Sequence, residues 1–284
     1  MVPEPTGITA RLTPLPGVRA AIFDVYGTLL ISGSGEVGTR LESERGAPLA
    51  EAMREAGLRG RLDEAAGRGV VRLHAAIRTA HAARRADGVD FPEVEIRHIW
   101  AGVLRGLAEE GWLQAPPGGD VVEAVALGYE ARVNPVWPMP GAGRLLRALA
   151  RRGVVMGIVS NAQFYTPWFM EALLGGAPEA LGFAPALCAW SWTRGEAKPS
   201  GRLFLPVRAE LMQRGIESAE AVYVGNDCLN DVAAASAAGF RTALFAGDRR
   251  SLRLRTEDPR CGGVTPDIVL TSLMELDRVL RPAG

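Results

Sequence analysis

The chain has 284 residues, and its 32 Lys plus Arg balance its 32 Asp plus Glu, so the formal net charge is zero. A neutral chain has no overall field that attracts a polyanion, so we expect neither nucleic acid nor a membrane surface as partner. The three cysteines form no CxxC pair, which favours free thiols and a cytoplasmic location. No apolar run approaches the ~20 residues that span a bilayer.

The elements of an α/β fold follow one another along the chain. Residues 1–16 do not resemble an export signal, and we expect them to form a loosely held tail. Strands are predicted at 20–23, 154–159, 221–224, 242–245 and 268–270, and helices at 143–152, 202–214 and 231–238. Continuous apolar strands that alternate with helices are typical of a parallel sheet covered on both faces. The predicted fold class is therefore a doubly wound parallel sheet.

Residues 33–138 have a different pattern, with no convincing strand. Helices are predicted there at 48–56, 66–85, 92–110 and 120–133. A Ser/Gly-rich stretch precedes this region and a Pro-rich stretch follows it, as expected of a flexible and a stiffer linker. We therefore predict an all-helical domain, residues 33–138, inserted into a core made of residues 1–32 and 139–284.

Polar residues stand at the ends of several predicted strands. Asp24 follows the first strand, Ser160 and Asn161 follow the next, and Asp227 follows the strand at 221–224. Because the carboxyl ends of parallel strands share one edge, these side chains should converge there. Lys198 lies in a loop before a helix and could join them.

These residue types suit nucleophilic hydrolysis. The carboxylate of Asp24 can attack an electrophile, and water can then cleave the covalent intermediate. Asp24, Asp227 and Asp231 cannot all stay ionised beside an anionic substrate without positive charge nearby. Lys198 supplies one positive charge, and a hard divalent cation bound by oxygens would supply the rest.

Four short segments resemble the motifs of the haloacid dehalogenase (HAD) superfamily, in the family's order and spacing. They are FDVYGTLL at 23–30, VSN at 159–161, KP at 198–199 and GNDCLND at 225–231. The resemblance implies a Rossmann-like core, with the helical insertion standing where the family places its smaller cap domain. It implies three catalytic residues. Asp24 would be the nucleophile, Ser160 would bind the transferring group, and Lys198 would orient Asp24 and neutralise charge.

The resemblance also implies metal and substrate contacts. Mg²⁺ would be held by Asp24, the Tyr26 carbonyl and Asp227, with Asp231 as a second acidic contact. Substrate contacts are expected from Tyr26, Thr28 and Asn161. Asn226 stands where many relatives have the first aspartate of the fourth motif, so the division of roles among Asn226, Asp227 and Asp231 stays open.

Tyr26 departs from the phosphatase pattern, in which an aspartate at this place protonates the leaving oxygen. Tyrosine here is typical of 2-haloacid dehalogenases, which use no metal, whereas the acidic fourth motif is phosphatase-like. We expect a Mg²⁺-dependent phosphatase of a small phosphorylated metabolite, acting through a phospho-aspartyl intermediate. One alternative is a metal-independent 2-haloacid dehalogenase, in which a cap arginine such as Arg54 cradles the halide. The other is a degenerate core that serves as an interaction module. The sequence carries no signal of the substrate's identity or of the oligomeric state.

Overall fold

The computed structural model describes residues 1–33 and 46–280. The chain divides into two compact units, the first made of Met1–Gly35 and Val136–Gly284 and the second of Glu36–Pro135. Among the described residues, no helix combines the length and the apolar character needed to cross a membrane.

The first unit is built on a six-stranded parallel sheet. Its strands are β1 (Ala20–Phe23), β4 (Val155–Ser160), β5 (Phe183–Trp190), β6 (Ala221–Gly225), β7 (Arg241–Phe245) and β8 (Ile268–Leu270). They lie in the order β5-β4-β1-β6-β7-β8, with β1 hydrogen-bonded to both β4 and β6. The doubly wound α/β class predicted from the sequence is confirmed.

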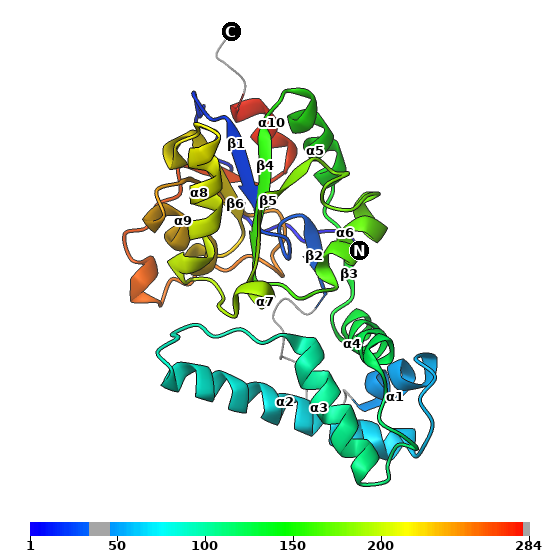
Figure 1. Ribbon diagram of the computed structural model, residues 1–284. Helices are drawn as coiled ribbons and strands as arrows, with labels where there is room; N and C mark the ends of the chain where they lie inside the picture. The colour runs from blue at the N-terminus through cyan, green and yellow to red at the C-terminus, as the bar shows by residue number, and fades with distance from the viewer. Residues whose placement is uncertain (34–45, 281–284) are drawn as a thin grey trace. The chain divides into compact units, whose positions relative to one another are not determined.

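Helices cover both faces of this sheet. They are α5 (Ala142–Arg151), α6 (Thr166–Leu174), α7 (Ser191–Arg194), α8 (Leu205–Gln213), α9 (Ala234–Ala237) and α10 (Met274–Val279). Helices α5 and α10 pack on one face, and α8 and α9 pack on the other (Figure 1). Strand β1 contributes Ala21 and Phe23 to the first face and Ala20 and Ile22 to the second. Burial on both faces explains why the strand is apolar at every position.

Strand β5 was not predicted from the sequence. It lies at the edge of the sheet, and its Pro185 and Ala186 are exposed. An edge strand tolerates proline because one row of its backbone groups needs no ladder partner. All eight residues of β5, FAPALCAW, are apolar, but a proline within the run argues against a central strand.

The prediction of a loosely held N-terminal tail is wrong. Arg11 forms an antiparallel bridge with Val269 of β8, with N···O distances of 2.9 and 3.0 Å. The Glu4 amide donates to Asp248, and the Thr6 hydroxyl donates to the Ala246 carbonyl. The tail is held because it pairs with the otherwise open edge at β8.

A small antiparallel pair lies where the chain leaves and re-enters the first unit. Strand β2 (Leu30–Ser32) pairs with β3 (Val136–Pro138), with Ile31 opposite Trp137. Both strands belong to the first unit. The predicted domain boundaries at residues 33 and 138 stay a prediction.

The described part of the second unit is helical. Its helices are α1 (Gly46–Glu55), α2 (Leu62–Ala86), α3 (Ile96–Glu109) and α4 (Gly119–Val133). Helix α1 packs against α2 and α4 through buried residues such as Leu49 and Met53. Arg54, the cap arginine of the dehalogenase alternative, donates to Asp63 at 2.5 Å within this unit.

Candidate active site

The predicted nucleophile and its neighbours meet at the carboxyl edge of the sheet. Asp24 directly follows β1, and its amide donates to the carbonyl of Val224 in β6 at 2.9 Å. Ser160 is the last residue of β4, the strand on the other side of β1. Because β1 lies between β4 and β6, residues from three consecutive strands of the sheet come within reach of Asp24.

One oxygen of Asp24 is anchored by two donors. The Ser160 hydroxyl donates to Oδ1 at 2.8 Å, and the Lys198 ammonium donates to the same atom at 2.8 Å. Within residues 1–33 and 46–280, no donor reaches Oδ2. The carboxylate is therefore held in one orientation through Oδ1.

Lys198 is the only lysine in the chain, since every other member of the 32 Lys plus Arg is an arginine. Its ammonium is buried and donates to Asp24 at 2.8 Å, Asp231 at 2.5 Å and the Tyr223 hydroxyl at 2.9 Å. Burial by itself lowers the pKa of Lys198, but Asp231 and Asp24 outweigh this effect and raise it above its usual value. The ammonium is therefore charged at neutral pH.

Asp231 is enclosed at the base of this network. Burial raises the pKa of Asp231 to about 6, with Lys198 acting in the opposite direction. Its Oδ2 accepts the Asp227 amide at 2.9 Å. Gly225 makes the close approach possible, because a Cβ at this position would lie 2.2 Å from the Asp231 Cγ.

Tyr223 belongs to the network although the sequence analysis did not single it out. Its hydroxyl donates to the Val159 carbonyl at 2.7 Å. Burial, followed by the charges of Asp231 and Asp24, raises the pKa of Tyr223 well above its usual value, so the phenol stays protonated. A tyrosine inside a strand that is otherwise Ala, Val and Gly is the sequence signal that could have revealed it.

Two of the residues predicted to contact substrate, Asn161 and Tyr26, form hydrogen bonds to neighbouring segments of the first unit. The Asn161 side chain accepts the Lys198 amide at 2.7 Å and donates to the Lys198 carbonyl at 3.3 Å. The Tyr26 hydroxyl lies 2.9 Å from the Thr166 hydroxyl at the start of α6. Asn161 thus fixes the loop that carries Lys198, and Tyr26 joins the first motif to α6. Their substrate roles stay predictions.

Thr28 and Asn226 join the first motif to the fourth. The fully buried Thr28 hydroxyl donates to Asn226 Oδ1 at 3.1 Å, and Asn226 Nδ2 donates to the Ser251 carbonyl at 2.6 Å. Gly27 has φ +82° and approaches so closely that a Cβ would lie 2.6 Å from Asn226 Nδ2. The fourth-motif side chain beside the nucleophile loop is therefore a neutral amide. The substrate role of Thr28 stays a prediction.

Asp227 is turned toward two other groups. Its Oδ1 accepts the amides of Leu229 and Asn230, which lie near the start of the π-helix Cys228–Ala233. The Arg255 guanidinium also grips both carboxylate oxygens, with Nε 3.0 Å from each and Nη2 2.6 Å from Oδ2. Asp227 therefore caps this helix. Arg255, 28 positions away, carried no sequence signal.

Two of the residues predicted to hold Mg²⁺, Asp227 and Asp231, do not fit the ion in this arrangement. The Asp227 oxygens already accept hydrogen bonds from the Arg255 guanidinium and from backbone amides. The Asp231 oxygens accept hydrogen bonds from Lys198 and from the Asp227 amide. Mg²⁺ needs oxygen ligands in a nearly octahedral set. Among the described residues, no group of three or more His, Cys, Asp or Glu is placed to hold a metal ion.

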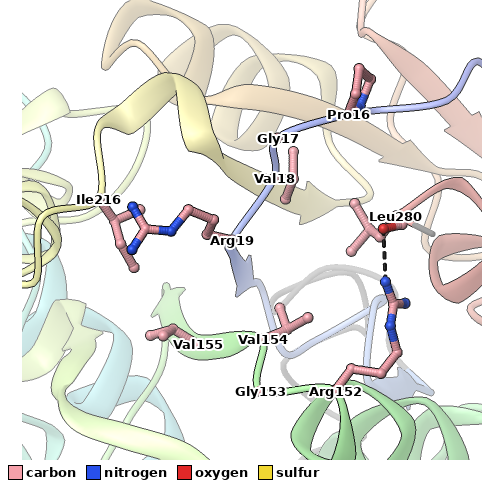
Figure 2. A pocket seen from close by; sticks show the side chains of 10 residues that line it. All are labelled: Pro16, Gly17, Val18, Arg19, Arg152, Gly153, Val154, Val155, Ile216 and Leu280. Atoms are coloured by element: carbon pink, nitrogen blue, oxygen red, sulfur yellow. Dashed lines mark hydrogen bonds between the residues drawn. The ribbon is translucent and has the colours of Figure 1, made fainter. Parts of the chain in front are cut away.

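A cavity of about 500 Å³ lies at the opposite end of the strands. It is lined by Arg19, which precedes β1, and by Val154 and Val155 at the start of β4 (Figure 2). At its rim, Arg152 donates to the Leu280 carbonyl at 2.7 Å (Figure 2). Because Asp24 and Ser160 follow the carboxyl ends of the same strands, this cavity does not contain the candidate nucleophile.

Comparison with solved structures shows the fold. The chain is similar to a 2-haloacid dehalogenase from Pseudomonas syringae pv. Tomato DC3000, at 19% identity over 92% of this chain and 97% of that chain, with a TM-score of 0.55. It is also similar to a predicted phosphoglycolate phosphatase from Haemophilus somnus 129pt, at 13% identity over 93% and 99% of the two chains, with a TM-score of 0.50. At these identities the likeness concerns the fold alone. No curated protein matches the chain.

A family model described as a haloacid dehalogenase-like hydrolase matches residues 18–239. The matched region runs from the residues before Asp24 to the end of the helix that follows the fourth motif, and so includes all four motifs. It covers most of the chain. The chain therefore belongs to the haloacid dehalogenase-like hydrolase family.

Proposed function

We propose that the protein is a metal-independent hydrolase of the 2-haloacid dehalogenase type, with Asp24 as nucleophile. The observation that carries this proposal is the pairing of Arg255 with Asp227, at 2.6 Å between Nη2 and Oδ2. Arg255 thus supplies a positive charge at Asp227, the carboxylate that was expected to bind Mg²⁺.

The charges of the site support displacement at carbon. The carboxylates of Asp24, Asp227 and Asp231 face two protein cations, Lys198 and Arg255. When these groups are ionised, one negative charge is in excess, and Asp24 is the carboxylate with an oxygen that no described donor reaches. An incoming phosphoryl group would bring its negative charge to the atom that Asp24 attacks, whereas a 2-haloacid presents an uncharged C2 to Asp24 and carries its charge on the neighbouring carboxylate.

The reaction follows from this geometry. Asp24 Oδ2 attacks C2 of a 2-haloacid, the carbon–halogen bond breaks with its electron pair, and halide leaves as an ester forms on Asp24. Water then adds to the Asp24 carboxyl carbon, and the 2-hydroxy acid departs while a proton passes to solvent. Ser160 and Lys198 hold Oδ1 through both steps, so the attacking oxygen keeps its direction.

A Mg²⁺-dependent phosphatase is the second candidate function. The acidic fourth motif favours it, because Asp227 and Asp231 both stand within the turn after β6. It requires Arg255 to leave Asp227 and release the carboxylate. The fold does not decide between the two candidates, since it is shared with a dehalogenase and with a phosphatase.

One parallel assay tests the proposal. Halide release from 2-chloropropionate and phosphate release from an aryl phosphate are measured on the same preparation, with EDTA and with added Mg²⁺. We expect halide release that survives EDTA and is lost in Asp24→Asn. Phosphate release that needs Mg²⁺ would overturn the proposal in favour of the phosphatase. Neither activity, in a folded protein, would favour the interaction module.

A further inference from the structure

Tyr223 contacts Lys198, one of the two groups that fix the nucleophile, and the residue that precedes Ser160, the other group. It stands in β6, 1% exposed, so its phenol is enclosed by the core. Its hydroxyl accepts the Lys198 ammonium at 2.9 Å and donates to the Val159 carbonyl at 2.7 Å. Val159 immediately precedes Ser160, and Lys198 and Ser160 are the two donors to Asp24 Oδ1. The Tyr223 hydroxyl therefore contacts both Lys198 and the end of β4 that carries Ser160.

The ammonium of Lys198 has three N–H donors and three acceptors, which are Asp24, Asp231 and Tyr223. The two carboxylates alone would leave one buried donor without a partner and would let the ammonium shift between them. The third acceptor comes from a strand in the middle of the sheet, and its ring packs against Phe204 at 5.2 Å between centroids. Tyr223 therefore supplies the third hydrogen-bond acceptor of the Lys198 ammonium from a rigid strand.

The geometry around this nitrogen also suits lysine better than arginine. The other 31 of the 32 Lys plus Arg are arginines. Arginine presents a planar fork of donors, whereas an ammonium directs three donors tetrahedrally from a single atom. Three acceptors around one nitrogen therefore suit lysine alone.

We propose that Tyr223 is a positioning residue that sets Lys198 and the end of β4, and through them the direction of Asp24. The proposal rests on the proposed role of Asp24 as nucleophile. Tyr223 does not touch the reacting atoms. Its removal should therefore lower the rate of the chemical step while leaving substrate affinity nearly unchanged.

The single lysine permits a direct test in the full-length protein. With ¹⁵N-lysine labelling, Lys198 is the only source of a side-chain ammonium signal. In the wild type we expect a slowly exchanging signal with nuclear Overhauser contacts to the Tyr223 ring. In Tyr223→Phe, hydrogen exchange at this ammonium should become about tenfold faster, since one of its three hydrogen bonds is lost. Tyr129→Phe, which removes a hydroxyl from a buried tyrosine of the second unit, is the matched control and should leave the signal unchanged.

Steady-state kinetics provide a second, independent test of the role of Tyr223. Tyr223→Phe should lower kcat about tenfold with KM changed less than about twofold. Unchanged ammonium exchange and unchanged kcat in a folded Tyr223→Phe would overturn the proposal. If that variant does not fold, the absence of contacts between the ammonium and the Tyr223 ring in the wild type would overturn it as well. Turnover retained in Asp24→Asn would instead overturn the proposed function, and the two failures are therefore distinguishable.

Discussion

The guanidinium of Arg255 grips both carboxylate oxygens of Asp227, with Nε 3.0 Å from each and Nη2 2.6 Å from Oδ2. This bidentate pairing is the geometry in which arginine binds a carboxylate most strongly. It gives Asp227 a structural partner from a segment that the family motifs do not include.

Arg255→Gln should open Asp227 to divalent cations. The wild type should show little heat of Mg²⁺ or Mn²⁺ binding in titration calorimetry, and the variant should bind more tightly because a carboxylate has lost its cation. The variant should also be destabilised by about 1–3 kcal/mol, since a nearly buried acceptor loses its charged donor. Arg253→Gln, a nearby arginine outside this pair, is the matched control. Equal cation affinity in all three proteins would contradict the role assigned to Arg255.

Asp24→Asn should abolish turnover, by about 10³-fold or more, with little change in folding. The amide oxygen can still accept from Ser160 and Lys198, but an amide is a poor nucleophile. The covalent step can be followed by single turnover in H₂¹⁸O, which should place ¹⁸O in Asp24 of the wild type. If the label appears only in the product, water attacks the substrate directly and Asp24 is not the nucleophile.

Lys198→Met should damage stability as well as activity. The ammonium is the buried partner of Asp24 and Asp231, so its loss leaves two carboxylates without their cation. Removing one partner of a buried pair typically destabilises by about 3–5 kcal/mol. Adding Asp231→Asn should recover part of this loss in urea unfolding, while activity stays low. A single variant as stable as the wild type would show that the network is not buried in solution.

Asp231 should give the protein a characteristic pH dependence. Burial raises its pKa from 3.8 to about 6 in the folded state. Between these values the folded protein holds a proton that the unfolded chain has released, so this group's contribution to stability falls as pH rises through this window. Urea unfolding of the wild type and Asp231→Asn should therefore show a stability difference that moves against the wild type from pH 3.8 to about 6. A difference independent of pH would contradict the raised pKa.

The sequence by itself determined the parallel sheet, apart from its edge strand β5, and the convergence of Asp24, Ser160 and Lys198. Strands that are apolar at every position must be buried on both faces, which requires helices on both sides and parallel neighbours. Parallel strands end at one edge, so residues that follow them meet there. In the structure, Ser160 and Lys198 both donate hydrogen bonds to Asp24.

Only the tertiary structure decided how the fourth motif is used. The three polar residues of this motif are close in sequence but have different partners. Asn226 accepts from Thr28, Asp227 pairs with Arg255, and Asp231 pairs with Lys198. These directions depend on the π-helix at Cys228–Ala233, which Asp227 caps, and on the return of the segment that carries Arg255. The role of Tyr223 was hidden for a related reason, since the sequence places it in a buried strand but does not show which groups its hydroxyl meets. Spacing along the chain specifies which element a side chain belongs to, whereas its partner depends on what packs against that element.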